Sequence, residues 1–395
     1  MRRFVRVGLL LELGRAYGRR LCEGVSSVAL ARGWELVSLA LDDLRHDGVR
    51  MDALIARVYD ERVAAVLKGL GKPCVDIFAA VRGTGFSTVD ADHAAIGRLA
   101  AEHFLEHRFP TFAYCGYDGV TFSDLRRDSF VERLARAHFD CIRYATPEAA
   151  RRDFTAHVLR NERLRMGPDD RQMLAWVRKL PKPVAVFCSH DLRAYQLAQT
   201  CRRAGIDVPR EVAILGTDDD VIVCSFSSPM LSSVDPDAFG IGRTAAETLA
   251  RLLEKPEAGP FQLTVPPKGV MMRPSTEMYP LDPPWLSEAL VYINRNVGAK
   301  ITSADVGRHL GMSHTPIDRA FRTVLGTSVQ KEIVRARLSL AEHLLKTTSQ
   351  PVGEIACRVG FSRLEYFCTS FRARYGVTPS AYRARSTPGS ARSGN

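Results

Sequence analysis

Short apolar runs alternate with helical patterns along the first 275 or so residues of the chain. In the stretch 15–32, for example, Leu21, Val25 and Ala29 recur along one stripe, as they do in an amphipathic helix. Strands that alternate with helices favour parallel sheets covered on both faces. The sequence therefore predicts an α/β part with two lobes. Its predicted strands are 5–11, 34–39, 53–56, 74–78, 87–89, 112–115, 184–188 and 212–215.

The last quarter of the chain is helical and contains one pattern twice. The stretch 311–328 recurs at 360–378, offset by 49 residues at the first glycine and by 50 at the last. Each copy predicts a short helix, a tight turn and a second helix, which is the helix-turn-helix arrangement. The amphipathic stretch 329–345 predicts one long helix between the copies. Such a helix would fix the spacing of two recognition helices on successive faces of a DNA major groove.

The second copy allows three local predictions. We expect Gly360 to supply the left-handed conformation of the turn. We expect Ser362 to cap the next helix by accepting a hydrogen bond from a backbone N–H group. Aromatic residues recur along that helix and predict a buried face made of Tyr366, Phe367, Phe371 and Tyr375.

Positive charge is concentrated in the helical part. The net charge is +11, and residues 285–395 hold 16 Lys+Arg against 7 Asp+Glu, whereas residues 1–284 hold 39 against 37. Such concentration suits a polyanionic partner, because counterion release from phosphates supplies most non-specific DNA affinity. A solvated basic surface is the alternative. Together with the helix pattern, the charge favours DNA binding.

No catalytic motif is present. No Gly-x-Gly-x-x-Gly, Gly-x-Ser-x-Gly or Gly-Lys-Ser/Thr phosphate loop follows a predicted strand, so we expect no enzyme. His103 and His107 have the spacing of metal ligands on a helix, but two surface histidines are the simpler interpretation. The consecutive aspartates 218–220 could hold a cation, although a binding crevice explains them with fewer assumptions. We therefore predict no metal and no cofactor.

Cysteine usage and hydropathy bear on the compartment. The nine cysteines include no Cys-x-x-Cys pair, so the sequence predicts no disulfide framework and fits a reducing environment. No apolar run reaches the length of a membrane span, and the N-terminal region is too polar for a signal peptide. We expect a cytoplasmic protein without a membrane partner.

Two parts of the chain resemble known families. The pattern IA-x-x-x-GF-S, F-x-x-x-F-x-x-x-x-G-x-TP-x-x-YR at 355–383 resembles the AraC-type bipartite DNA-binding domain, with a match that begins near Leu286. The α/β part resembles the sugar-sensing periplasmic-binding-protein fold of LacI-type repressors. The segments that carry this second resemblance are VDADH at 89–93, FLEHRF at 104–109, SHDLRA at 189–194, VAILGTD at 212–218, SPMLSSV at 228–234 and G-x-G-x-x-AA at 240–246.

This order of parts is similar to that of the xylose operon regulatory proteins over nearly the whole chain. The expected organisation is a sugar-sensing domain over 1–276, a Pro-rich linker over 277–285 and an AraC-type DNA-binding domain over 286–384. The remaining residues, 385–395, are rich in Ser, Gly and Arg and are predicted to be disordered.

Polar and aromatic residues that follow predicted strands are the candidates for a ligand site. In folds of this class, ligands bind beyond the carboxyl ends of the strands. A sugar requires carboxylates, Arg groups and an aromatic face, and the candidates provide all three. They are Glu12, Arg15, Asp92, Phe122, Arg126, His190, Asp191 and Asp218.

The resemblance adds roles to some of these positions. It implies hydroxyl-binding roles for Asp92, Arg126 and Asp218 and an aromatic contact for Phe122. His190 stands where sugar-binding relatives commonly have Asn. Alternatives remain for the acidic residues: Asp92 and Asp191 could cap the helices that follow them, and Asp218 could lie in a solvated turn.

The DNA-binding candidates of the first copy lie on the exposed face of its second helix. Thr315, Asp318 and Arg319 match base-contacting positions of the resembled family. Arg319 is the candidate for a bidentate guanine contact, with an ion pair to Asp318 or to another local carboxylate as the alternative. Ser313, together with the N-terminal amides of the helix, is expected to contact phosphate.

The second copy offers a comparable set. Arg363, Glu365 and Thr369 occupy the corresponding face, and Ser362 corresponds to Ser313. Thr369 stands where relatives often have Arg, so we expect this copy to read bases less strongly than the first.

The sequence thus predicts a sequence-specific DNA-binding transcription regulator controlled by a small sugar. The resemblance implies xylose or a related pentose as the effector and an activator of sugar-catabolic genes. It also implies a homodimer on a double-stranded DNA operator and contact with RNA polymerase. Two alternatives stay open. The α/β part could sense a purine or a phosphorylated sugar, or it could be an enzyme fused to a helical interaction module.

Overall fold

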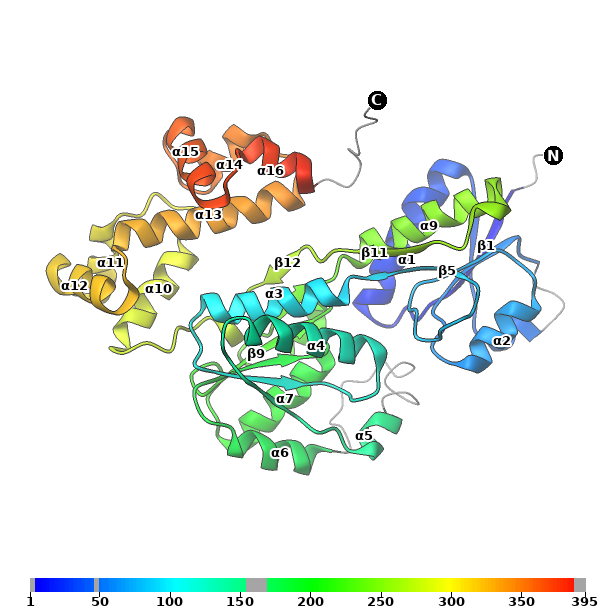
Figure 1. The fold of residues 1–395 in the computed structure, drawn as a ribbon, viewed down its shortest axis with the longest axis horizontal. Helices are drawn as coiled ribbons and strands as arrows, with labels where there is room; N and C mark the ends of the chain where they lie inside the picture. Colours follow the sequence, from blue (N-terminus) through cyan, green and yellow to red (C-terminus); the bar gives the residue numbers. More distant parts are fainter. Residues whose placement is uncertain (1–3, 46–49, 154–168, 387–395) are drawn as a thin grey trace. The chain divides into compact units, whose positions relative to one another are not determined.

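The computed structural model describes residues 4–45, 50–153 and 169–386 (Figure 1). The chain divides into two compact units, Met1–Thr276 and Glu277–Asn395. The predicted α/β part with two lobes and the predicted helical part are both confirmed. Most of the predicted tail, from 387 onward, lies outside the described residues. Among the described helices, none is long and apolar enough to cross a membrane.

The first unit contains two six-stranded sheets, one in each lobe. Their strand orders are β11-β5-β4-β3-β1-β2 and β12-β10-β9-β8-β6-β7, and every neighbouring pair is parallel except β10 with β12. All eight predicted strands are present, with ends that differ by at most two residues. The strands are β1 (Arg6–Leu10), β2 (Glu35–Ser38), β3 (Ala53–Ala56), β4 (Cys74–Asp76), β5 (Ser87–Ala91), β6 (Thr111–Cys115), β7 (Cys141–Arg143), β8 (Val184–Cys188), β9 (Val212–Thr217), β10 (Ser232–Asp235), β11 (Gln262–Val265) and β12 (Gly269–Met271).

Helices cover both sheets, because a parallel sheet is apolar on both faces. In the first lobe, α1 and α9 cross closely: a Cβ atom on Gly24 would lie 2.1 Å from the carbonyl oxygen of Phe239, so only glycine fits there. The helices are α1 (Ala16–Arg32), α2 (Glu61–Gly69), α3 (His93–Glu106), α4 (Thr121–Ala135), α5 (Glu148–Asp153), α6 (Asp170–Lys179), α7 (Asp191–Ala204), α8 (Val221–Ser225) and α9 (Ala238–Glu254), with short 3-10 turns at η1 (Asp42–Arg45), η3 (Pro256–Ala258) and η4 (Pro274–Thr276).

The chain passes between the two lobes three times. It leaves β5 of the first lobe for α3 of the second, returns from β10 to α9, and crosses again from β11 to β12. Among the described residues, the backbone joins the lobes only at these crossings, so residues beside them are placed to respond to a change in the angle between the lobes.

The described part of the second unit, up to residue 386, contains helices and no strands. Two apolar clusters form its core, one holding Ile317 and Phe321 and the other Phe367 and Phe371. Both clusters include residues of α13, which confirms the predicted long connecting helix. The helices are α10 (Trp285–Arg295), α11 (Ser303–Leu310), α12 (His314–Leu325), α13 (Val329–Thr347), α14 (Val352–Arg358), α15 (Leu364–Tyr375) and α16 (Pro379–Ser386).

Of the three local predictions made for the second helix-turn-helix motif, one is confirmed and two are wrong. Gly360 has the expected left-handed conformation, with φ of +89°. Ser362 does not cap α15: the N-cap position is Arg363, and no side chain bonds to the first turn there. Tyr366 is not buried with the other aromatics: it is 54% exposed, because it lies at the edge of the apolar stripe, where its ring contacts Phe361.

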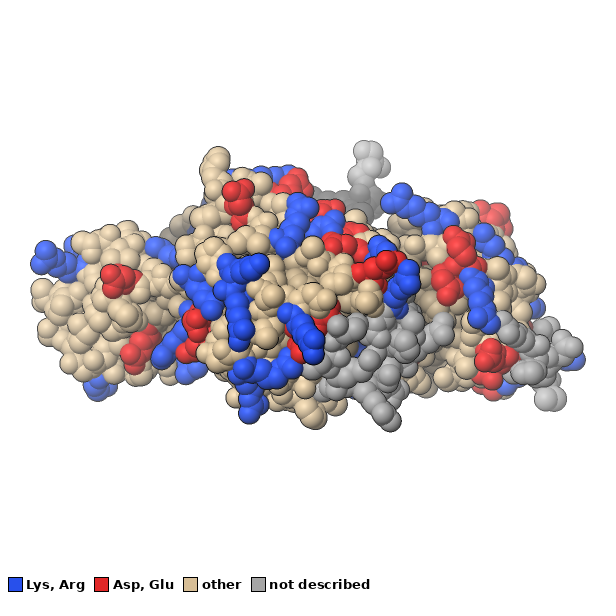
Figure 2. Space-filling model, turned by 90° about the horizontal axis from the view of Figure 1, so that it is seen from below, with Lys and Arg blue, Asp and Glu red and all other residues tan. Residues whose placement is uncertain are grey.

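The positions of two histidines correct the sequence interpretation. His103 and His107 are buried and not on the surface; His103 bonds to Thr276 (2.9 Å), and His107 bonds to the carbonyl oxygen of His103 (2.7 Å). In Figure 2, Asp and Glu side chains are interspersed among Lys and Arg on the visible face.

Candidate functional site

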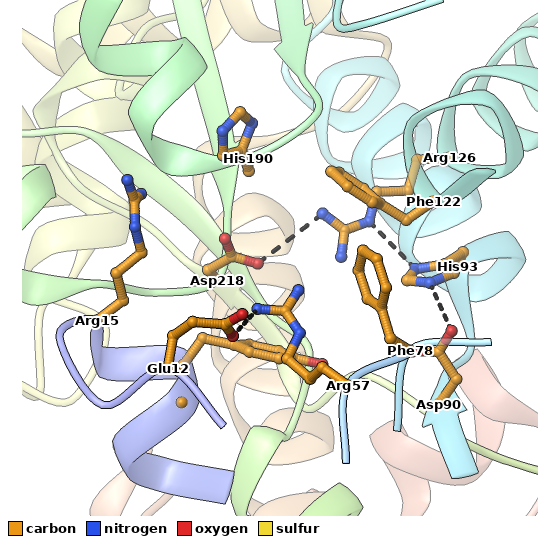
Figure 3. A pocket seen from close by; sticks show the side chains of 12 residues that line it. Glu12, Arg15, Arg57, Phe78, Asp90, His93, Phe122, Arg126, His190 and Asp218 are labelled. Carbon is orange, nitrogen blue, oxygen red and sulfur yellow. Dashed lines mark hydrogen bonds and ion pairs between the residues drawn. The ribbon is translucent and has the colours of Figure 1, made fainter. Parts of the chain in front are cut away.

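A pocket lies where the carboxyl ends of the strands from both lobes face each other (Figure 3). Residues of the first lobe come from the ends of β1, β3, β4 and β5 and from the first turn of α1. Those of the second lobe come from the start of α3, from α4 and from the ends of β8 and β9. The lining consists of Glu12, Arg15, Tyr17, Gly18, Arg57, Phe78, Asp90, His93, Phe122, Arg126, His190 and Asp218.

Six of the eight predicted ligand-binding residues line this pocket, and two do not. Asp92 caps α3, where its carboxylate accepts a hydrogen bond from Ala95 N (2.8 Å). Asp191 is buried and is not part of the lining; it accepts hydrogen bonds from Ser233 Oγ (2.6 Å) and Asp220 N (2.8 Å). For Asp92 the capping alternative therefore describes the structure, whereas Asp191 braces the loop that carries Asp218.

Arg126 is held by a chain of polar contacts. Its Nε donates to His93 Nδ1 (3.3 Å), and His93 Nε2 contacts Asp90 Oδ2 (3.2 Å). These partners fix the His93 tautomer: Nε2 carries the proton and Nδ1 accepts. Arg126 Nη1 donates to the carbonyl oxygen of Ser189 and lies 3.9 Å from Asp218 Oδ1. The side of the guanidinium that faces the pocket is thus fixed in orientation before any ligand arrives.

A second Arg–carboxylate pair lies across the pocket in the first lobe. Arg57 Nη1 donates to Glu12 Oε2 (2.9 Å), and the Arg57 guanidinium lies 4.3 Å from the centre of the Phe78 ring. Phe122 faces Phe78 at a ring-centre distance of 6.2 Å and an angle of 49°. The pocket therefore combines two aromatic faces with two oriented Arg groups.

The titratable groups of the pocket balance in charge near neutral pH. Burial raises the pKa of Asp218 to about 6, against the opposing effect of Arg126 and Arg15, so this carboxylate is ionised at pH 7. Burial also lowers the pKa of His93 and lowers that of His190 well below its usual value, so both imidazoles are neutral. Three Arg side chains then face three carboxylates, and the lining has no net charge.

Six lining residues were not predicted from the sequence. Arg57 and Phe78 follow predicted strands, as the chosen candidates do, so the same rule would have found them. Asp90 and His93 flank the chosen Asp92, and the choice among neighbours required knowledge of which side chains turn toward the pocket. Tyr17 and Gly18 lie in the first turn of α1, which the strand-end rule does not cover; Gly18 leaves room for the carbonyl oxygen of Glu12, which would lie 1.8 Å from a Cβ atom.

The predicted DNA-reading residues of the first helix-turn-helix motif lie on one face of α12. Ser313, Thr315 and Arg319 are exposed. Asp318 forms an ion pair with Arg322 (2.8 Å), not with Arg319. No ion pair involves the Arg319 guanidinium among the described residues, which leaves it available for a partner outside the chain.

The corresponding face of α15 is arranged differently. Ser362, Arg363 and Glu365 are exposed. The Thr369 hydroxyl donates to the carbonyl oxygen of Glu365 (2.9 Å), so its proton is used within the helix. That the second motif reads bases less strongly than the first stays a prediction.

Metal binding finds no support in the described ranges. No group of three or more His, Cys, Asp or Glu side chains is arranged to hold an ion there. His103 and His107, the pair with metal-ligand spacing, are engaged in the hydrogen bonds given above.

The chain matches two family models. Residues 101–276 match the periplasmic binding protein-like domain, and residues 306–385 match a helix-turn-helix domain. These two regions correspond to much of the first unit and most of the second.

Relatives align along nearly the entire chain. The xylose operon regulatory protein of Haemophilus influenzae is 24% identical over 393 residues, covering 96% of this chain and 98% of the relative. The xylose operon regulatory protein of Escherichia coli strain K12 is 26% identical over 390 residues, covering 96% of each. A solved structure of a xylose-binding transcription activator superposes with a TM-score of 0.60 at 25% identity, covering 98% of this chain and 99% of that one.

Proposed function

We propose that the pocket of this AraC-type DNA-binding transcription regulator binds D-xylose or a related neutral pentose. The premise is the similarity of the chain, along nearly its entire length, to the xylose operon regulatory proteins. Binding of the sugar would control the affinity of the helical unit for DNA. The lobes contact the sugar from both sides, so the sugar favours one angle between them, and the DNA-binding state follows as a population shift.

The balanced charge of the pocket carries this proposal. Three Arg groups and three carboxylates can share hydrogen bonds with the vicinal hydroxyls of a sugar, and the rings of Phe78 and Phe122 can cover its C–H faces. A phosphorylated sugar would bring charge that the lining does not compensate. A purine is favoured by parallel aromatic plates, whereas these two rings are tilted by 49°.

The DNA-binding role rests on the two helix-turn-helix motifs. We propose that the first motif reads bases through Arg319, whose exposed guanidinium has the fork geometry that matches a guanine edge. The second motif would mainly contact the backbone through Arg363 and Ser362. The proposed domain limits are 1–276 for the sensor, 277–285 for the linker and 286–384 for the DNA-binding domain.

The proposal extends to the compartment, the oligomeric state and the partners of the regulator. We propose a regulator without catalytic activity that acts in the cytoplasm as an activator of sugar-catabolic genes. It would bind a symmetric operator as a homodimer, since symmetric subunits present paired motifs to paired half-sites, and would contact RNA polymerase.

Thermal-shift measurements with a panel of pentoses, hexoses, pentose phosphates and purines test the effector class. We expect stabilisation of several degrees by D-xylose or one related pentose, and loss of that stabilisation in Asp218→Ala. Asp92→Ala is the matched control, because this carboxylate caps α3 outside the pocket. Stabilisation by a purine or a pentose phosphate, with none by any free sugar, would refute the proposed effector.

A further inference from the structure

The consecutive aspartates 218–220 face three different parts of the first unit. Asp218 lines the pocket, whereas Asp219 and Asp220 are buried outside its lining. The backbone here is unusual: φ is +115° at Asp218 and +48° at Asp219. Side-chain-bearing residues rarely adopt such values, which persist where the surroundings impose them and which cluster at functional segments. Pocket binding accounts for Asp218 but not for its two neighbours.

The Asp219 carboxylate bonds to two arginines from different parts of the unit. Oδ2 lies 3.3 Å from Nη2 of Arg20, which belongs to α1 of the first lobe. Oδ1 accepts a hydrogen bond from Arg273, which lies in the segment just before η4. Since Asp219 itself follows β9 of the second lobe, one carboxylate connects both lobes and the segment that begins at Arg273.

That segment is where the chain leaves the first unit, and it is tied to the second lobe. Arg273 N donates to Ser232 Oγ (2.8 Å), and Ser275 Oγ donates to the carbonyl oxygen of Ile214 (2.6 Å). Thr276, the last residue of the unit, shares a 2.7 Å bond with Ser232 and a 2.9 Å bond with His103. A shift of Arg273 would therefore be passed to the residue from which the helical unit continues.

Asp220 adds a second connection between the lobes. Its Oδ2 accepts a hydrogen bond from Ala16 N in the first turn of α1 (3.3 Å), while its Oδ1 caps α8. The Arg20–Asp219 contact has the same length. Charge-assisted hydrogen bonds are typically about 2.7 to 2.9 Å long, so both contacts would strengthen if the lobes approached each other.

We propose that Asp219 is the positioning residue that couples the angle between the lobes to the exit segment 273–276, and so to the DNA-binding unit. A ligand that contacts Asp218 in one lobe and Glu12 and Arg57 in the other draws the lobes together. Arg20 then moves toward Asp219, and the carboxylate shares its charge between Arg20 and Arg273. Asp219 does not contact the ligand in this scheme. The proposal rests on the proposed function, because it takes a pocket ligand as the signal.

The first test measures how D-xylose changes the DNA affinity of the full chain. The DNA is a duplex that the unmutated protein has selected from a random library. For Asp219→Asn we expect D-xylose to give an unchanged thermal shift, but its effect on DNA affinity to fall from about 5-fold or more to less than about 2-fold. Arg20→Gln should behave in the same way. Arg32→Gln is the matched control, since Arg32 lies on the same helix as Arg20 but forms its ion pair with Glu254 of α9, within the first lobe.

Two outcomes of this test would overturn the proposal. One is a normal DNA response to sugar in Asp219→Asn; the other is loss of sugar binding in that variant, which would make Asp219 a pocket residue. If D-xylose fails to stabilise the unmutated protein, the proposed effector is refuted instead. The same comparison is then made with the panel compound that does stabilise it.

Hydrogen exchange tests the coupling without any ligand. The amides of Arg273, Ser275 and Thr276 are hydrogen-bonded and report on the exit segment. Although Arg20 lies in the other lobe, Arg20→Gln should accelerate exchange at these amides several-fold, whereas Arg32→Gln should not. Equal exchange rates in the two variants would overturn the proposal, whatever the effector proves to be.

Discussion

Neutralising Asp218 should stabilise the protein and weaken sugar binding at the same time. The substitution is Asp218→Asn, which keeps the shape of the side chain and suits a positive φ better than most residues do. Burial raises the pKa of this carboxyl from 3.8 to about 6, so its ionised form destabilises the fold at neutral pH.

The size of the stabilisation expected for Asp218→Asn follows from that pKa. At 1.36 kcal/mol per pH unit, a rise from 3.8 to about 6 corresponds to about 3 kcal/mol. The side chain keeps 24% of its exposure, so solvent reduces the gain to about 1 to 2 kcal/mol. For a unit of this size, such a gain raises Tm by about 2 to 6 °C. Loss of a charged hydrogen bond to the sugar should cost about 1.5 to 3 kcal/mol, or roughly 10- to 150-fold in Kd.

The raised pKa also determines whether the stability of the unmutated protein rises or falls with pH. Between pH 3.8 and about 6, folded Asp218 holds a proton that the unfolded chain has lost, so the unmutated protein loses stability as the pH rises through this window. The gain from Asp218→Asn should be absent near pH 4 and complete above pH 6 to 7. Thermal unfolding at pH 4 and 7.5, with calorimetric titration of D-xylose at pH 7.5, measures both effects. A lower Tm at pH 7.5, or an unchanged Kd, would refute the reasoning.

Three further substitutions probe other parts of the molecule. Arg319→Ala should weaken specific DNA binding by about 1 to 3 kcal/mol and relax preference at one base position, as measured by competition among single-base operator variants; unchanged specificity would exclude base reading. Gly360→Ala should destabilise the helical unit by about 1 to 3 kcal/mol in urea unfolding, because it strains a backbone with φ of +89° and places Cβ 2.8 Å from Arg337 Nε. Arg193→Met should destabilise the first unit by about 3 to 5 kcal/mol in the same assay, since it leaves Asp169 buried after loss of a 2.6 Å ion pair; a near-neutral effect would contradict this.

The fold was largely predictable because its main signals are local. Buried parallel strands such as 53–56 and 184–188 are continuous apolar runs, and their predicted ends agree with β3 and β8. Four short strands were missed. The edge strands β7, β11 and β12 are only partly buried, and the buried interior strand β10 has the sequence SSVD, so none of them shows a continuous apolar run.

Pocket residues were predictable from the sequence where they directly follow strands whose carboxyl ends meet at the pocket. Asp218 and His190 follow strands and do line the pocket. Asp92 also follows a strand, but its carboxylate turns back to cap α3, because a helix N-terminus offers unsatisfied N–H groups at hydrogen-bonding distance. The Arg126–His93–Asp90 chain depends on side chains that meet only after the lobes have folded, which no spacing in the sequence encodes.

The most direct test of sugar control is the DNA affinity of the full chain during a titration with D-xylose, followed by fluorescence anisotropy of a labelled operator at fixed salt. We expect the Kd for DNA to change by about 5-fold or more at saturating sugar. The change should be half-complete at the sugar concentration that half-saturates the thermal shift, and it should be absent in Asp218→Asn at that concentration. An operator affinity that stays the same at saturating sugar would contradict it.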